Sequence, residues 1–372
     1  MRRFTKKVFL IINIITGFLF IAGANVKFFN PDKYWFLSLL TLILPYLIAV
    51  LLIFFVFWLL VKPFYSLFSL ICIALGWSAV INILPMRVSS KFDLAKKPHT
   101  IRVLSWNVEL FNILNHKTHP EKREAMLELI NTYDPDIACL QEVVAGETPK
   151  AINFFPDIES KLKFSDYFYA YNLKNDFDKY HHFGTLIFSK YPILRKQSMV
   201  NNPNDYNSTF QFIDVLIGND TVRIFNVHLQ SLKFTEENLR YIDSGKIETN
   251  AANESKSVIE KIKTGIEKRA VQANFVKDEM NHTPYPLILC GDFNDVPVSY
   301  AYETLGKNLQ NAFVKKGSGI SRTYASISPT LRIDNIFADS SFSILQFATI
   351  KKDLSDHFPI VADLELKSQA RK

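Results

Sequence analysis

After about residue 100, five apolar, β-rich segments end in residues that commonly bind metal ions or transfer protons. These residues are Asn107 with Glu109, Glu142, His228, Asp292 with Asn294, and Asp356 with His357. Such side chains are rarely buried unless they are paired or coordinate an ion. One Asp-X-Asn in a turn would carry little weight, but five clusters at the same position relative to a strand predict one site at the strand ends.

The types of residue in these clusters indicate a reaction. Carboxylate and amide oxygens without thiolates suit a hard cation such as Mg²⁺ or Mn²⁺. Two histidines and a further carboxylate remain to activate water and to stabilise a charged oxygen. This combination fits the hydrolysis of a phosphoester.

The segments that lead into these clusters have the composition of strands, and helical segments lie between them. We expect strands over 101–108, 137–140, 167–171, 184–188, 211–217, 222–228, 287–290, 332–337 and 360–366, and helices over 120–133 and 255–280. This alternation predicts an α/β sandwich of two packed sheets flanked by helices. The predicted catalytic domain covers 100–368, between a linker over 89–99 and a tail over 369–372.

The N-terminal region, 1–88, has a different composition. Three uncharged apolar segments, about 8–26, 35–61 and 64–84, are long enough to cross a bilayer core, which takes about 20 residues. We therefore expect three transmembrane helices before the catalytic domain. A signal peptide is the alternative for the first segment, because a basic start and small residues at 22–24 also fit that pattern.

Positive charge predicts how this region is oriented. Residues 1–97 contain 11 basic and two acidic residues, whereas the remainder contains 32 basic and 34 acidic residues, so the pI of 9.0 reflects the N-terminal region. Arg2, Arg3, Lys6 and Lys7 precede the first segment and predict a cytoplasmic N-terminus. Three spans then place the catalytic domain outside the cytoplasm, in a multi-pass protein of the cell (inner) membrane. Basic residues between 87 and 97 oppose this orientation, although long translocated domains obey the rule weakly.

The three cysteines fit no metal-finger spacing. Cys72 lies in the third apolar segment, and Cys139 and Cys290 each lie in an apolar run. We expect small buried side chains at all three positions. A disulfide between Cys139 and Cys290 would require the strands that carry them to be neighbours.

Seven segments resemble, in order, the signature segments of the endonuclease/exonuclease/phosphatase superfamily. They read SWNVELFN, PDIACLQEV, GTLIFSKYPI, FNVHLQS, LILCGDFNDVP, RIDNIF and SDHFPIVADL. The resemblance runs from about Thr100 to Leu366 and includes none of the apolar segments. It implies a DNase-like two-sheet sandwich and a hydrolase that cleaves phosphoester bonds with the help of Mg²⁺ or Mn²⁺.

The same resemblance implies a metal side of the site. Glu142 corresponds to the principal metal ligand, and Asn107 and Asp356 lie on the metal side. Glu109 stands where some relatives have an acidic residue that helps to hold a metal.

The remaining matched residues correspond to groups that act on water and phosphate. Asp292 is similar to the residue that orients or deprotonates the attacking water, and Asn294 would hold Asp292 and the scissile phosphate in place. His228 resembles the histidine that contacts the phosphate. His357 resembles the histidine that stabilises the developing charge or protonates the leaving oxygen, and Asp334 resembles the carboxylate that orients it.

The resemblance defines the chemistry better than the substrate, since one fold serves many ligands. Val143 and Val144 follow Glu142 where apurinic-type enzymes carry a Lys, and RIDNIF stands where inositol 5-phosphatases show Cys-Asp-Arg. Both departures count against those branches. We expect a membrane-anchored phosphodiester hydrolase whose leading substrate is extracellular nucleic acid. A phospholipid or an inositol or sugar-phosphate headgroup is the alternative, a catalytically silent membrane scaffold is a remote one, and no stable protein partner is predicted.

Overall fold

The computed structural model of the protein describes residues 3–87, 91–146, 148, 150–175, 177–205, 207–232 and 251–367. The predicted tail, 369–372, lies outside the described residues, as do residues 89 and 90 of the predicted linker.

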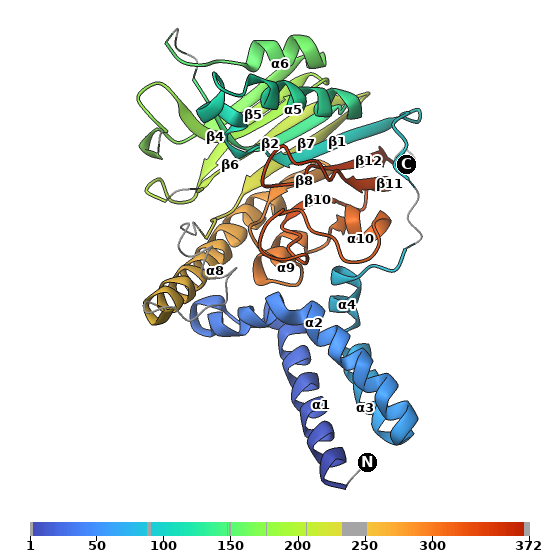
Figure 1. Ribbon diagram of the computed structural model, residues 1–372. Coiled ribbons are helices and arrows are strands. Elements are labelled where there is room, and N and C mark those ends of the chain that lie inside the picture. Colours follow the sequence, from blue (N-terminus) through green and yellow to red (C-terminus); the bar gives the residue numbers. More distant parts are fainter. Residues whose placement is uncertain are drawn as a thin grey trace.

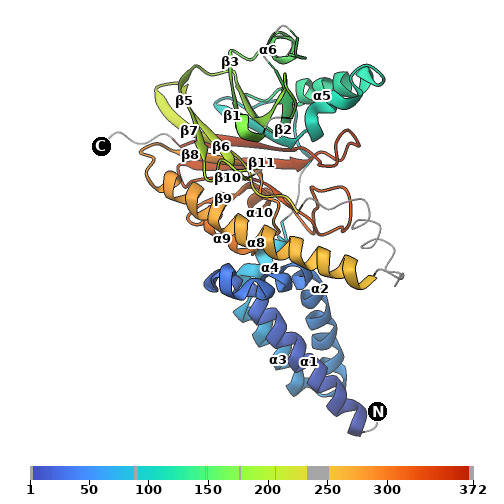
Figure 2. The ribbon, with the colours of Figure 1, turned by 90° about the vertical axis from the view of Figure 1, so that its left-hand side faces the viewer.

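Two six-stranded sheets face each other and carry helices on their outer faces (Figures 1 and 2). The first sheet has the order β11-β12-β1-β2-β4-β3, and the second has the order β5-β6-β7-β8-β10-β9. The strands are β1 Thr100–Asn107, β2 Ile137–Ala145, β3 Asp166–Tyr171, β4 His182–Ser189, β5 Ile193–Val200, β6 Thr209–Ile217, β7 Asp220–His228, β8 Leu287–Asp292, β9 Gln310–Asn311, β10 Asp334–Ala338, β11 Phe342–Thr349 and β12 Ile360–Leu366. The predicted two-sheet α/β sandwich is thereby confirmed.

Strand pairing follows the same plan in both sheets. β1 pairs in parallel with β2, and β7 pairs in parallel with β8, whereas the other neighbouring strands are antiparallel. Because the carboxyl ends of parallel strands meet at one edge, each sheet brings two strand ends together at its centre. The polar clusters that follow β1, β2, β7 and β8 therefore lie close to one another.

Apolar side chains fill the space between the sheets. Val103 and Leu364 from the first sheet pack against Ile213 and Ile288 from the second, and all four are almost fully buried. Cys139 and Cys290 lie in this core on β2 and β8, and both are free thiols. Their strands belong to opposite sheets and face each other across the core, where the two thiols interact.

Helices cover the outer face of each sheet. The helices of the catalytic domain are α5 Pro120–Tyr133, α6 Phe155–Leu162, α8 Ala251–Asn281, α9 Tyr300–Gly306 and α10 Ala312–Lys316. Met126 and Ile130 of α5 pack on the first sheet. Ala273 and Val276 of α8 pack on the second sheet. α8 extends the helix expected over 255–280 by four residues at its start and one at its end.

The N-terminal helices lie on one side of the sandwich, away from α5 and α6 (Figure 1). They are α1 Arg3–Ala24, α2 Pro31–Val61, α3 Pro63–Leu75 and α4 Trp77–Ile83. α1 and α2 are long and apolar enough to cross a membrane. The segment expected as the third span forms two helices, α3 and α4, bent by 70°, and the pair passes the same test of length and composition when it is taken as one broken span. Gly76 lies at the bend, where a Cβ would approach the ring of Phe20 to 2.4 Å.

The structure also contains elements that the sequence pattern does not predict. β5 is an edge strand with exposed and half-buried residues, and β11 lies at the edge of the first sheet. Edge strands bury less apolar surface, so the alternation of apolar and polar residues in their sequences is weak. β10 starts at Asp334 rather than at the expected Arg332.

Gly291 provides a test of how far the site depends on the pairing of β7 with β8. Its φ is +145°, and a Cβ there would lie 1.9 Å from the carbonyl oxygen of Val227. We expect Gly291→Ala to force the two strands apart, to destabilise the protein by about 3 kcal/mol or more and to abolish activity. Thermal unfolding of the detergent-solubilised full chain measures the first effect.

Gly218 provides the matched control, because it lies in the turn between β6 and β7 with a φ of +63°, and an added Cβ would meet no atom within 4 Å. Gly218→Ala should cost only about 1 kcal/mol and should retain activity. Equal stability of the two variants would contradict this explanation of Gly291.

Candidate active site

Three polar residues lie side by side across the second sheet. His228 at the end of β7 pairs in register with Asp292 at the end of β8, and Asp292 pairs with Asp334 at the start of β10. All three side chains are almost fully buried. The sheet hydrogen bonds therefore place an imidazole and two carboxylates in one row.

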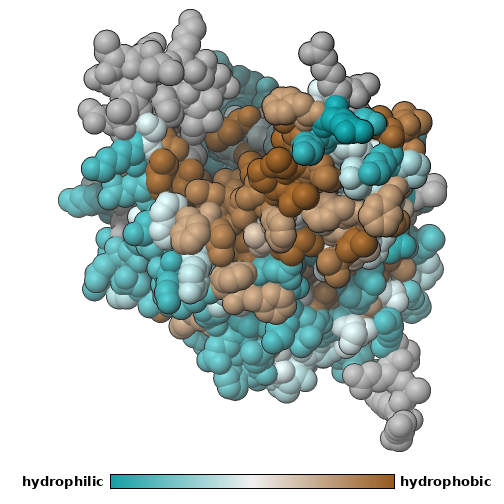
Figure 3. All heavy atoms as spheres, turned by 90° about the horizontal axis from the view of Figure 1, so that it is seen from below, coloured by the Kyte–Doolittle hydropathy of each residue, from teal (hydrophilic) through white to brown (hydrophobic). Residues whose placement is uncertain are grey.

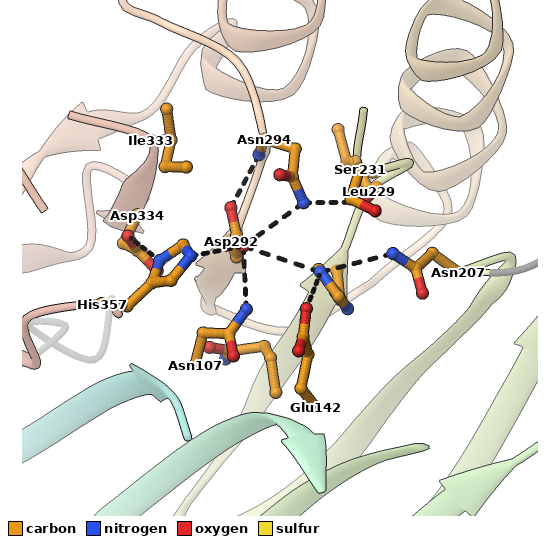
Figure 4. A network of polar contacts seen from close by, with 12 residues as sticks. Asn107, Glu142, Asn207, Leu229, Ser231, Asp292, Asn294, Ile333, Asp334 and His357 are labelled. Carbon is orange, nitrogen blue, oxygen red and sulfur yellow. Dashed lines mark hydrogen bonds and ion pairs between the residues drawn. The ribbon is translucent and has the colours of Figure 1, made fainter. Parts of the chain in front are cut away.

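Asp292 lies at the centre of the polar network in Figure 4. Its Oδ1 accepts a hydrogen bond from the backbone N–H of Asn294 at 2.7 Å, and its Oδ2 accepts one from Nδ2 of Asn107 at 3.1 Å. The Nε2 atoms of His228 and His357 lie 3.6 and 3.7 Å from the same Oδ2. Burial raises the pKa of Asp292, while the two histidines oppose that rise.

Asn294 holds Asp292 from a strained turn. Its φ is +50°, in the left-handed region that Asn tolerates better than most residues. Its Nδ2 donates to the carbonyl oxygen of Leu229 at 3.0 Å and lies 3.3 Å from Oδ2 of Asp292. The side chain thus ties the end of β8 to the loop after β7.

Glu142 is directed into the site by an irregularity in β2. The pairing of β2 with β4 shifts register between Leu140 and Val143, and Glu142 has a φ of +53°. Its Oε1 lies 3.5 Å from Nε2 of His228. Burial raises the pKa of Glu142 to about 7, and the Asp356 carboxylate adds to that rise.

His357 and Asp334 form a hydrogen-bonded pair. Nδ1 of His357 lies 2.9 Å from Oδ2 of Asp334. Burial alone lowers the pKa of His357, but Asp334 and Asp292 outweigh it and hold that pKa well above its ordinary value. The ring is therefore an imidazolium at neutral pH, with Nε2 directed toward Asp292.

His228 has the opposite protonation state. Burial lowers its pKa to about 4, although Asp292 and Asp356 act in the other direction. The site therefore holds one neutral and one charged imidazole around a single carboxylate. Pairs of titratable groups whose pKa values are separated in this way are typical of acid and base roles.

The donor set fits a divalent cation. Burial and the Asp356 carboxylate raise the pKa of Glu142 in a half-enclosed cleft, an effect that a cation would oppose, and Asn107 adds a neutral oxygen. A different set, Asp292, Asp334 and His357, has ligand atoms within 4.8 Å of one another. In this set Nδ1 of His357 is already hydrogen-bonded to Asp334, whereas Nε2 faces Asp292.

Asp356 and Glu109 complete the predicted residues. Asp356 lines the same cleft as Glu142, Asn294 and His357, and the Ser355 hydroxyl donates to its Oδ1 at 3.3 Å. Glu109 lies at the rim, where its half-exposed carboxylate pairs with Lys122 of α5 at 3.5 Å. The structure thus gathers eight of the predicted residues and leaves the Glu109 side chain outside the cluster.

Two neighbours of the histidines were not predicted from the sequence. Nδ2 of Asn207 lies 3.4 Å from Nε2 of His228, and the Tyr324 ring is centred 5.1 Å from the ring of His357. Both lie in loops without a strand pattern, so no periodicity marks them. Asn207 begins an Asn-Ser-Thr sequon, but its side chain is buried against His228.

The comparisons with known proteins agree with this geometry. Residues 104–357 match the family model described as endonuclease/exonuclease/phosphatase family, and residues 6–83 match a domain of unknown function. The chain belongs to the endonuclease/exonuclease/phosphatase family, whose members hydrolyse phosphoesters with divalent metals. The search of curated proteins found no match.

Solved structures share the fold at low sequence identity. An endonuclease/exonuclease/phosphatase from Beutenbergia cavernae has a TM-score of 0.53 at 16% identity, with 72% of each chain covered. One from Bacteroides vulgatus has a TM-score of 0.52 at 20% identity, with 72% of this chain and 99% of that chain covered. D. rerio TDP2 complexed with a single-strand DNA product has a TM-score of 0.50 at 17% identity, with 72% and 99% covered.

Metal binding should depend on pH through Glu142. A cation must displace the proton of a carboxyl group whose pKa is about 7, so the affinity for Mn²⁺ should rise as the pH increases toward 7 and then level off. Calorimetric titration of the purified full chain at several pH values measures this.

Glu142→Gln should weaken Mn²⁺ binding by about tenfold or more and remove the pH dependence. Glu128→Gln, at an exposed position on α5, is the matched control and should bind Mn²⁺ as the native protein does. Unchanged binding by Glu142→Gln would show that the cation lies elsewhere.

Proposed function

We propose that the protein is a membrane-anchored, divalent-metal-dependent phosphodiester hydrolase whose catalytic domain lies outside the cytoplasm. The observation that carries the proposal is the buried Asp292 carboxylate, whose Oδ2 lies within 3.7 Å of Nε2 of both His228 and His357. A carboxylate that accepts protons, an imidazolium and a cluster of acidic metal ligands are the parts that hydrolysis of a phosphodiester requires.

Each group has a role that follows from its surroundings. Asp292, with its raised pKa, orients the attacking water and takes its proton, while Asn294 holds the carboxylate in position. His357, kept charged by Asp334, stabilises the leaving oxygen and protonates it. Neutral His228 contacts the phosphate.

The metal side completes the proposed site. Glu142, Asp356 and Asn107 would hold Mg²⁺ or Mn²⁺, with Glu109 an outer acidic group at the rim. When bound, the cation neutralises charge on the phosphate.

The orientation in the membrane is supported by the distribution of basic residues. Arg3, Lys6 and Lys7 begin α1, and Lys62 lies in the turn between α2 and α3. Phe9 of α1 stacks on Phe57 of α2 at 5.2 Å, so these four cations lie at the same end of the helices, far from the catalytic domain (Figure 1). The positive-inside rule favours this end in the cytoplasm.

Nucleic acid and lipid headgroups both contain the phosphodiester that this chemistry cleaves. D. rerio TDP2, which shares the fold, is complexed with a single-strand DNA product. The sequence favours extracellular nucleic acid, with a headgroup as the alternative.

Asp292→Asn should test the catalytic assignment. The substitution keeps the shape of the side chain but removes the proton acceptor, so hydrolysis of bis-p-nitrophenyl phosphate with Mn²⁺ should fall by about 100-fold or more. EDTA should abolish the activity of the native protein. Asp157→Asn, at an exposed position of α6, is the control and should stay fully active. Full activity of Asp292→Asn with an unchanged melting temperature would refute the proposal.

The orientation of the protein in the membrane can be tested with single introduced cysteines. The three native cysteines are buried, so they should react little with a labelling reagent. In intact cells, a membrane-impermeant maleimide should label Lys351→Cys, at an exposed position of the catalytic domain. It should label Lys62→Cys, at the opposite end of the helices, only after the cells are broken. The reverse pattern would place the catalytic domain in the cytoplasm.

A further inference from the structure

One cleft of about 490 Å³ joins the catalytic residues to a membrane helix. Glu142, Asp356 and His357 line it on one side. Thr41 and Leu42 of α2 line it as well. A helix that is long and apolar enough to cross a bilayer therefore forms part of the wall of the active-site cleft.

The position of Leu42 along α2 places this opening at the bilayer boundary. The cationic end of the helices includes Lys62, and a bilayer core of about 30 Å corresponds to about 20 helical residues. Counting back from Lys62, this length reaches Leu42. Gly23, close to the end of α1 at Ala24, packs against Leu40 and Leu44, so both helices reach the boundary at the same level.

The walls between the catalytic residues and α2 are predominantly apolar. Val258, Ile262 and Ile266 lie on one face of α8 and line the cleft. Lys263 on the same helix lies over the Trp35 ring of α2 at 5.9 Å, so the two helices run close together here. Ile327, from the loop before β10, also lines the cleft and is 43% exposed.

An exposed apolar side chain also lies in the loop before β10. Viewed from the side of the membrane helices, apolar residues cover the centre of the molecule, where these helices project toward the viewer, and hydrophilic residues form much of its border (Figure 3). Ile320, in the loop that also carries Ile327, is 52% exposed. That loop contacts the helices, because Gly319 donates a backbone hydrogen bond to Pro85 at 2.9 Å and the Ser328 hydroxyl lies 3.4 Å from that of Tyr46.

The charges of the cleft do not suit a polyanion. Nucleic-acid affinity depends on Lys and Arg side chains that are available to phosphates. Among the described residues that line the cleft, Arg269 is the only Lys or Arg. It is buried, lies 3.1 Å from Asp295 and donates to the carbonyl oxygen of Gln230. Apart from His357, a chain of phosphates would find mainly acidic and apolar side chains among the described residues of the cleft.

We propose that the substrate is a phospholipid of the surrounding bilayer, which enters the cleft laterally between α2 and α8 with an acyl chain against the apolar face of α8. The proposal rests on the proposed hydrolase function and names its substrate class. Water adds its oxygen to phosphorus, one P–O ester bond breaks, and the leaving alkoxide takes up the remaining proton. The reaction needs no oxidant or other reactant.

The test uses the full chain reconstituted with Mn²⁺ in vesicles of phosphatidylethanolamine and phosphatidylglycerol. Release of a water-soluble headgroup, with or without its phosphate, measures lipid cleavage. Hydrolysis of bis-p-nitrophenyl phosphate and of a single-stranded DNA oligonucleotide is measured on the same preparation. The proposal predicts lipid cleavage that Asp292→Asn removes.

Ile262→Asp places a charge on the wall of the acyl-chain path. It should lower lipid hydrolysis by about tenfold or more relative to hydrolysis of the soluble diester. Ile259→Asp is the matched control, because Ile259 is exposed on the same helix and does not line the cleft, so it should leave both activities unchanged. Ile327→Asp, in a loop that tolerates exposure, should repeat the effect of Ile262→Asp if that variant unfolds.

Each outcome separates the two proposals. Metal-dependent cleavage of DNA or of the soluble diester without lipid cleavage would overturn the lipid substrate and leave the hydrolase function standing. Equal effects of Ile262→Asp and Ile259→Asp on lipid cleavage, in folded variants, would overturn the acyl-chain path. Failure to cleave any of the three probes would overturn both proposals.

Discussion

A buried carboxylate constrains the whole catalytic domain. Asp292 is fully buried, and a charge removed from water is costly unless partners surround it. Those partners are two amide groups, from Asn107 and Asn294, and two imidazoles, from His228 and His357. They come from both sheets and from two loops, so Asp292 is compensated only when the sandwich is closed. The interaction that supports the proposed chemistry is also one that selects the native packing.

The opposite protonation states of the two histidines follow from the same constraint. Both rings are buried, which disfavours the charged form. His357 has a second carboxylate, Asp334, in direct hydrogen-bonding contact. The other neighbours of His228 are the Asn207 amide and the Glu142 carboxyl group, whose own pKa burial raises to about 7. The hydrogen bond to Asp334, which His228 lacks, therefore separates the two pKa values. Contacts within the protein are therefore sufficient to keep a protonated imidazole beside a neutral one.

Polar contacts hold the catalytic domain against the membrane helices. Lys27, just after α1, forms an ion pair with Glu303 of α9 at 2.9 Å, and Asn82 of α4 donates to the same carboxylate at 3.2 Å. Arg332 donates to the backbone oxygen of Asn82, so the loop before β10 is attached to the helices as well. These contacts give the cleft a defined orientation toward the bilayer. A domain tethered only by a linker would not present its cleft in one direction.

The sequence predicted those parts of the fold in which burial leaves a local pattern. Interior strands such as β1, β7 and β12 bury apolar side chains in long runs and were predicted to within one or two residues. The edge strands β5 and β11 bury less and leave no such pattern. The segment expected as a span over 64–84 is divided by a bend at Gly76, where the ring of Phe20 from another helix leaves no room for a Cβ, a contact that composition does not encode.

By itself, the sequence determined the two-sheet sandwich, the apolar N-terminal helices, the family and the residue types that gather at the strand ends. Only the tertiary structure decided that Glu109 lies at the rim, that Asn207 and Tyr324 adjoin the histidines, and that α2 lines the cleft. The physical reason is the separation along the chain over which each feature forms. Strand and helix patterns arise from each residue's own burial and are visible within a short stretch of sequence. A cleft wall is formed by segments far apart in the chain, and no local pattern records their contacts.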